Sequence, residues 1–433
     1  MKKSGLSGKS MMAIVSLAIA GSVIYELPYI KYVYYDSLLE AFGMTNAQSG
    51  FLLSMYAIGC MVCYIPGGII ADRFPTKKLM LISLFSTGVF GIALAFMMNY
   101  TAALIIYFLF ALSTSFVFWT ALMKALRLIG GKENSGAAYG MYYALGSVVA
   151  FIAGALFLFV FNRLIGPDMN NHKEAMFGVI LSMGITAIVS AVLVFFTYRD
   201  DKEAQTPEED KFKVRDLPKA IKNPFVWGAA ILMFLMYAVY SCASYFTPFL
   251  TARVGMDVSE AGLVSFIRTY ILFFLTPIGG YIADKVLKST LKVYSIGFIF
   301  LGLSFLGVMF IPEGVAGRTG AIAVTMISSA FAIILYGIMW SILNELKIPV
   351  VYAGTAVGLC SLLAYTPDLF LHTIFGTWID TYGDGEGYIR IFVCLAIFCA
   401  IATVLSLIMA VRAKKLVGQD EPSDAETVSA EEA

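Results

Sequence analysis

Long apolar runs separated by short polar segments make up most of this chain. Each run supplies the roughly 20 apolar residues that one helix needs to cross a bilayer. The pattern predicts twelve membrane-spanning helices, over residues 11–38, 47–72, 78–99, 102–126, 136–162, 174–197, 224–250, 260–284, 290–311, 319–343, 353–379 and 388–411. We therefore expect an all-α polytopic membrane protein.

The composition agrees with this pattern. The 433 residues are 59% hydrophobic and only 14% charged, whereas soluble domains carry roughly a quarter charged residues. The chain has only two histidines, and it shows no cluster of metal ligands and no nucleotide-binding loop. We expect no enzyme activity, cofactor, metal or nucleic-acid partner.

The distribution of lysine and arginine indicates how the chain lies in the membrane. With the N-terminus in the cytoplasm, the cytoplasmic segments contain 23 of the 30 Lys and Arg residues. Cationic loops stay in the cytoplasm during membrane insertion. We expect both termini to be cytoplasmic and the protein to lie in a bacterial inner membrane.

The chain contains an internal repeat. The second predicted helix ends in Pro66-Gly-Gly-Ile-Ile-Ala-Asp-Arg73, and a near copy ends the eighth, from Pro277 to Lys285. The two aspartates, Asp72 and Asp284, lie 212 residues apart, about half the chain. Such self-similarity indicates a duplicated unit. We predict four parts: a six-helix bundle over 1–197, a cytoplasmic linker with a short surface helix over 198–223, a second bundle over 224–411, and a disordered cytoplasmic tail over 412–433.

The spacing Gly68-x-x-x-Asp72-Arg73 after the second helix, with Ala71 and Lys77, resembles the signature of the major facilitator superfamily. Pro75 and Thr76 depart from that signature, which makes the turn less cationic. The resemblance covers residues 11–411 and implies two six-helix bundles that rock about a central site. It also implies a gating contact, formed here by Gly68, Asp72, Arg73, Asp284 and Lys285.

Ionisable side chains inside a membrane are costly, so each one is a candidate functional residue. Glu26 and Lys31 lie on the first predicted helix, and Arg268 and Asp368 lie on the eighth and eleventh. We expect Lys31 and Arg268 to bind an anionic substrate and Glu26 and Asp368 to take coupling protons. The alternative is that Arg268 and Asp368 form a fixed structural ion pair. His372, one helical turn after Asp368, is interpreted as a structural residue.

Tyrosines recur at a similar depth to these charged residues. A phenol ring with a hydroxyl suits a small polar ligand, and it equally suits the membrane interface. We expect Tyr29 and Tyr237 to contact the substrate.

The resulting hypothesis is a secondary transporter for a small organic anion, driven by protons as a symporter or by another coupling ion, and acting as a monomer. Within the family, paired cations in the two halves are typical of organic-anion members. The passage Trp119–Arg127 is similar to bacterial members labelled nitrate- or carboxylate-transporter-like. The glycine-rich helices of the nitrate group are absent, which disfavours nitrate itself.

Two alternatives remain. A drug–proton antiporter is disfavoured because no proline follows Gly154, where that group has one. A non-transporting membrane sensor on the same fold is the other.

Overall fold

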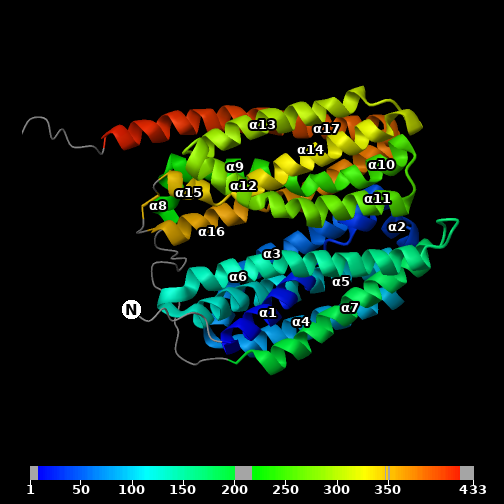
Figure 1. Cartoon of the computed structure of the whole chain (residues 1–433), viewed down its shortest axis with the longest axis horizontal. Helices are drawn as coiled ribbons and strands as arrows, with labels where there is room; N and C mark the ends of the chain where they lie inside the picture. Colours follow the sequence, from blue (N-terminus) through cyan, green and yellow to red (C-terminus); the bar gives the residue numbers. More distant parts are fainter. Residues whose placement is uncertain (1–7, 200–216, 347, 350–351, 420–433) are drawn as a thin grey trace, which may run out of the picture.

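The computed structural model describes residues 8–199, 217–346, 348–349 and 352–419, excepting some helical side chains, chiefly those of residues 64–73. The described part is almost entirely helical and shows no strand, which confirms the predicted all-α fold. The helices run along one common direction (Figure 1). Those of the first half of the sequence lie in the lower part of this view and those of the second half in the upper part.

The first half contains three shorter helices, α1, α2 and α5, and four long ones. A π-helical segment, η1 (Leu112–Phe118), joins α5 to α6, and α6 contains a kink with non-helical backbone at Gly131 and Asn134. The α-helices of this half are α1 (Gly8–Val23), α2 (Lys31–Phe42), α3 (Asn46–Arg73), α4 (Thr76–Phe96), α5 (Tyr100–Ala111), α6 (Trp119–Leu164) and α7 (His172–Thr197).

The second half is divided into more and shorter helices. Its α-helices are α8 (Leu217–Lys222), α9 (Pro224–Cys242), α10 (Phe246–Val254), α11 (Val258–Phe266), α12 (Thr276–Tyr281), α13 (Thr290–Gly307), α14 (Arg318–Gly337), α15 (Ser341–Glu345), α16 (Ala353–Ala364) and α17 (Pro367–Gln419). A positive φ at Gly383 divides α17 into two arms. Its second arm continues past the predicted span end at residue 411. The linker's surface helix, expected to start at Thr206-Pro207-Glu208-Glu209, and the final residues 420–433 lie outside the described residues.

Nine helical stretches of the described residues are long and apolar enough to cross a membrane. One of them, residues 353–414, is long enough for two crossings. The first predicted span is interrupted, and the second, α3, ends in residues whose side chains are not described. The chain is a multi-pass membrane protein.

Several predicted spans are not continuous helices. The prediction of one helix over 11–38 is wrong, because α1 ends at Val23 and turns separate it from α2. Pro28 lies in this interruption and has no N–H to donate to a helix. The predicted helix over 353–379 is likewise divided at Tyr365 and Thr366, and Pro367 begins α17, at a position where proline is favoured.

The predicted helices over 260–284 and 319–343 are also interrupted. Between α11 and α12 the backbone follows π-helical η5 (Ile267–Ile271) and 3₁₀-helical η6 (Leu272–Leu275), and after α12 it follows π-helical η7 (Ile282–Val286). Turns at residues 338–340 separate α14 from α15. Irregular backbone inside a membrane is tolerated where it is buried in protein or lines a cavity. The interruptions at η5 and at residues 338–340 therefore indicate where a central site lies.

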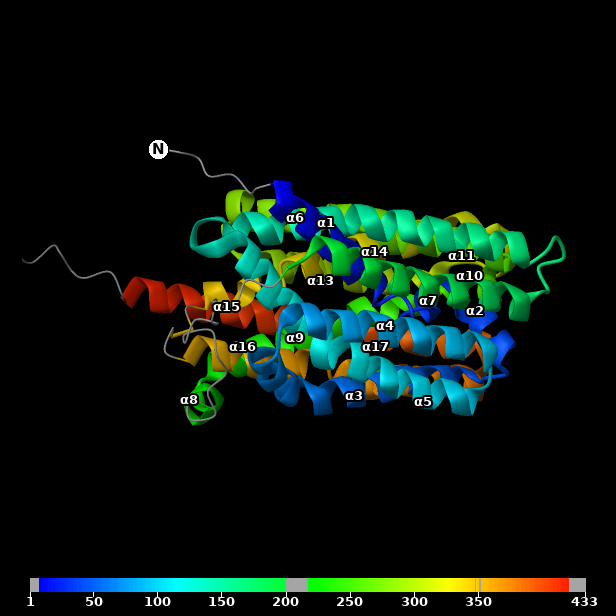
Figure 2. The ribbon, with the colours of Figure 1, turned by 90° about the horizontal axis from the view of Figure 1, so that it is seen from below.

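The two halves contact each other closely at one end of the molecule. We call the end where α1 begins and α17 ends the termini face, and the opposite end the far face. At the far face, α3 of the first half packs against the first arm of α17 (Figure 2). A Cβ added to Gly50 would lie 2.1 Å from the His372 carbonyl oxygen, and one added to Gly376 would lie 2.2 Å from that of Asn46.

Polar contacts accompany this packing. Ser259 Oγ donates to Asn162 Oδ1 at 2.7 Å, and Thr251 Oγ1 donates to Asp36 Oδ2 at 2.9 Å; each bond joins the two halves. In this conformation the halves are therefore closed against each other at the far face.

Candidate functional site

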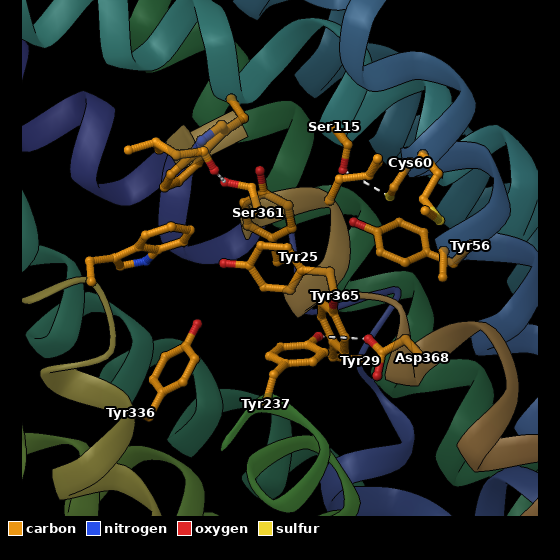
Figure 3. A pocket seen from close by; sticks show the side chains of 16 residues that line it. Tyr25, Tyr29, Tyr56, Cys60, Ser115, Tyr237, Tyr336, Ser361, Tyr365 and Asp368 are labelled. Atoms are coloured by element: carbon orange, nitrogen blue, oxygen red, sulfur yellow. Dashed lines mark hydrogen bonds between the residues drawn. The ribbon is translucent and has the colours of Figure 1, made fainter. Parts of the chain in front are cut away.

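A cavity of about 490 Å³ lies between the two halves (Figure 3). Its described lining extends to Val357, near the start of α16 at the termini face. The interrupted spans contribute Tyr29, Trp340 and Tyr365 to the wall. Aromatic side chains dominate this wall: Tyr25, Tyr29, Tyr56, Trp119, Tyr237, Tyr336, Trp340 and Tyr365.

A second cavity of about 260 Å³ adjoins the first. Five tyrosines line both cavities: Tyr25, Tyr29, Tyr237, Tyr336 and Tyr365. Among the described lining residues, the charged side chains are Asp368 in the first cavity and Glu26 in the second. The predicted contact residues Tyr29 and Tyr237 thus lie between two spaces that each hold one carboxylate.

Asp368 lies where a helix begins inside the protein. It is the second residue of α17, and its side chain is buried. The positive end of a helix dipole stabilises a carboxylate at this position. Tyr237 Oη donates to Asp368 Oδ2 at 2.6 Å, a bond drawn in Figure 3. The sequence predicted one continuous helix over 353–379, so the stabilisation of Asp368 by the start of α17 could not be predicted from it.

His372 and Lys31 continue from Asp368 away from the cavity. His372 follows Asp368 by one turn, and its Nε2 lies 3.3 Å from Asp368 Oδ1. Its Nδ1 lies 3.2 Å from Lys31 Nζ. Lys31 is only 1% exposed, and its Nζ lies 5.2 Å from the centre of the Tyr245 ring. The predicted substrate-binding lysine is therefore placed behind the cavity wall, in contact with a histidine.

Arg268 is also buried, in the π-helical segment η5. Its Nη2 donates to Thr247 Oγ1 at 2.8 Å and lies 3.4 Å from both the Tyr32 carbonyl oxygen and Ser265 Oγ. Its Nη1 has no hydrogen-bond partner among the residues that the structure describes. Among the described residues, no carboxylate lies within 4 Å of this guanidinium, so this conformation does not contain the alternative ion pair with Asp368.

Glu26 lies in the interruption between α1 and α2, in the wall of the second cavity. Its Oε2 accepts a hydrogen bond of 2.5 Å from Tyr270 Oη, which belongs to the other half. The ring of Tyr270 packs against Gly154, where an added Cβ would lie 2.5 Å from the ring. Both predicted proton-binding carboxylates are thus held by tyrosine hydroxyls.

The predicted gating residues lie at the termini face. Gly68, Asp72 and Arg73 belong to the end of α3, and their side chains lie outside the described ones. Asp284 and Lys285 lie in η7 and are exposed. The gating contact stays a prediction.

Some site residues were not recognised from the sequence. Trp119 and Trp340 lie 221 residues apart, close to the spacing of the repeated aspartates, and line the same cavity from the two halves. Their equivalent places in the repeat could have indicated a shared site. His372 was interpreted as structural, although its spacing from Asp368 placed the two on one helix face.

Comparison with known proteins gives consistent matches. A sequence model of the Major Facilitator Superfamily matches residues 10–366. The chain is 27% identical to the inner membrane protein YqcE of Escherichia coli (strain K12), covering 87% of this chain and 88% of the relative. It is 21% identical to the hexuronate transporter of Bacillus subtilis (strain 168), covering 83% and 86%.

Among solved structures, a similar one is a bacterial homologue of the human lysosomal transporter Spinster in an inward-facing, unoccupied conformation. The TM-score is 0.73 at 16% identity, covering 94% of this chain and 98% of that one. At this identity the likeness concerns the fold alone.

Proposed function

Because the chain belongs to the Major Facilitator Superfamily, we propose that it is a secondary transporter that carries a small polyhydroxylated organic anion together with protons. Its relatives and structural neighbours are transporters and not enzymes, and the two-bundle, twelve-helix fold predicted from the sequence is that of the family. The observation that carries the proposal is the balance of buried charges around the tyrosine-lined cavities.

Two cations and two carboxylates are held in the same central region. Lys31 and Arg268 lie behind the walls, and Glu26 and Asp368 lie on them. An unbalanced charge is costly in a region of low dielectric. Protonation of one carboxylate leaves one cation unbalanced, and an anionic solute would restore the balance. Proton binding and anion binding would then favour each other, which is the requirement for symport.

The uncharged residues of the cavity wall suit the hydroxyl-bearing part of such a substrate. Tyrosine hydroxyls both donate and accept hydrogen bonds, and their rings pack against apolar faces. A volume of about 490 Å³ lies within the usual range for sites of small ligands. The hexuronate transporter among the relatives is named for a sugar acid, a molecule with this combination of groups.

A second candidate follows from a different observation. Aromatic rings with one carboxylate also suit a lipophilic cation, through cation–π contacts, and no Lys or Arg occurs among the described lining residues. A drug–proton antiporter would use such a wall.

A ligand screen distinguishes these candidates, because a ligand that binds the folded state raises the thermal midpoint. The purified protein is tested with glucuronate, glucose, glucosamine and tetraphenylphosphonium, which differ in charge and polarity. We expect glucuronate to give the largest shift, and a larger one at acidic pH. If tetraphenylphosphonium is the one compound that stabilises the protein, the drug–proton antiporter becomes the better candidate.

The roles of the individual residues are tested by uptake into proteoliposomes. We expect Arg268→Ala to abolish accumulation of the sugar acid, and Glu26→Gln and Asp368→Asn to remove its response to an imposed proton gradient. Normal accumulation by Arg268→Ala would show that this arginine does not bind the anion.

We propose that the protein is a monomer in a bacterial inner membrane. We place its termini face in the cytoplasm, because most Lys and Arg residues lie on that side. The cavity would then extend toward the cytoplasm. Labelling of single cysteines at Asp284 and Gly314 with an impermeant reagent tests this, since these positions lie at opposite ends of the molecule.

A further inference from the structure

We propose that His372 passes protons between Asp368 and Lys31, so that the three side chains form a buried proton relay behind the cavity wall. The role of this relay in coupling rests on the proton-coupled transport proposed above. The relay itself follows from the contacts of the three residues.

The contacts suit a neutral imidazole. Such a ring has one N–H donor and one acceptor nitrogen, whereas an ammonium only donates and a carboxylate only accepts. His372 Nδ1 lies 3.2 Å from Lys31 Nζ, and Nε2 lies 3.3 Å from Asp368 Oδ1. Within the described part of the chain, neither Nε2 nor Oδ1 has a hydrogen-bond partner of good geometry. The two unpartnered atoms therefore face each other across the place where a proton would move.

Proton transfer along the three side chains conserves both the number of protons and the net charge. In the ionic form, Lys31 carries three protons on Nζ, His372 is neutral with its proton on Nε2, and Asp368 is a carboxylate. One proton moves from Nζ to Nδ1 while another moves from Nε2 to Oδ1. The products are a neutral amine, the other tautomer of neutral imidazole and a carboxylic acid. Both forms have zero net charge, so the step exchanges a buried ion pair for three neutral groups.

Lys31, His372 and Asp368 are surrounded by side chains that are ordinarily uncharged. His372 is fully buried, and Lys31 and Asp368 are 1% and 3% exposed. The other titratable side chains facing them are tyrosines and two cysteines: Tyr29, Tyr32, Tyr35, Cys60, Tyr237, Cys242, Tyr245 and Tyr336. Phenols and thiols are ordinarily neutral near neutral pH.

The relay also joins the two halves. Lys31 begins α2 in the first half, and His372 belongs to α17 in the second. Both lie near the far-face contact, since the His372 carbonyl faces Gly50. Separation of the halves at the far face would move Nζ away from Nδ1. Protons could then reach Asp368 from Lys31 only while that face is closed, which ties proton transfer to the conformational cycle.

His372→Gln tests the relay, because glutamine keeps a hydrogen-bond donor and acceptor but cannot pass a proton from one to the other. In proteoliposomes, accumulation of labelled glucuronate driven by a pH gradient is compared with exchange at equal pH on both sides. We expect the ratio of accumulation to exchange to fall at least tenfold, and the same for His372→Asn. His172→Gln changes the other histidine, which lies on α7 and contacts Ser37, and should leave the ratio unchanged. An unchanged ratio in both His372 variants, or equal loss of both activities, overturns the relay.

A second measurement needs no substrate. Lys31→Met and Asp368→Asn should each lower the thermal midpoint of the purified protein, because each leaves one buried charge uncompensated. The double variant should recover at least half of the combined loss. Additive losses would overturn the relay. Recovery in the double variant, with no sugar acid bound or transported by the wild type, would support the charge coupling and refute the proposed function.

Discussion

Asp380 of the second half caps the first turn of α3 in the first half. Its Oδ1 accepts hydrogen bonds from the backbone N–H and the side-chain amide of Asn46, at 3.1 and 2.8 Å, and its Oδ2 accepts from the Ala47 N–H at 2.8 Å. The first N–H groups of a helix have no partner within that helix and favour a nearby carboxylate. When the far face is closed, Asp380 accepts hydrogen bonds from these N–H groups. When the face opens, water must accept them instead.

We expect Asp380→Asn to weaken this closure. A hydrogen bond to a charged group contributes about 1.5–3 kcal/mol, and the exposure of Asp380 reduces this to about 1 kcal/mol. The balance between closed and open far faces should shift roughly fivefold toward open. The labelling rate of a cysteine at Thr373 measures this shift. Asp384→Asn, at an exposed aspartate four residues further on and beyond the break at Gly383, is the control and should change the rate little.

Gly50→Ala should prevent closure of the far face. The new Cβ would lie 2.1 Å from the His372 carbonyl oxygen and 2.7 Å from the Thr373 nitrogen, and backbone atoms cannot turn aside as a flexible side chain can. We expect glucuronate exchange to fall at least tenfold while the protein stays folded.

Gly140→Ala is the matched control for this prediction. Gly140 also lies in a helix, α6, but no described heavy atom lies within 4 Å of an added Cβ. Its exchange rate should equal that of the wild type. Normal exchange by Gly50→Ala would show that the far-face contact is not part of the transport cycle.

Tyr237→Phe removes the hydroxyl that donates to Asp368 Oδ2 at 2.6 Å. Loss of a bond to a buried carboxylate costs about 1.5–3 kcal/mol, so the carboxylate should bind a proton more readily. We expect the pH at which uptake is half-maximal to rise. Tyr107→Phe, at a buried tyrosine that does not line either cavity, should leave this pH unchanged. Equal pH profiles for wild type and Tyr237→Phe would exclude Asp368 as the group that controls uptake.

Tyr270→Phe should affect Glu26 in the same manner, since Tyr270 Oη donates to Glu26 Oε2 at 2.5 Å. This bond joins the two halves, so its loss should also speed their separation around the second cavity. We expect a higher pH of half-maximal uptake together with faster exchange. Glu26→Gln combined with Tyr270→Phe should add little to Glu26→Gln alone, because both changes act on one carboxylate.

Sequence reasoning could predict the helical class, the duplication and the identity of the buried charged residues, because each depends on local composition. It could not predict where the spans are interrupted. Along a continuous helix Lys31, five residues after Glu26, would point about 140° away from it. The turn containing Pro28 removes that relation and directs Lys31 to His372.

The contacts of Arg268 show the same limit. Its direction depends on the π-helical geometry of η5, which apolar periodicity does not reveal. Its neutral partners are Ser265, three residues earlier, Thr247 of α10, and the carbonyl oxygen of Tyr32 in the first half. The alternative of an ion pair with Asp368, considered from the sequence, could not account for this packing.

The chain has four tryptophans, and two of them, Trp119 and Trp340, lie on the wall of the larger cavity. Trp227 and Trp378 do not line either cavity, and the Trp378 ring packs against Phe375. A solute that enters would displace water from two of the four indoles and leave the other two unchanged. The unlabelled protein therefore carries its own fluorescence reporter of occupancy.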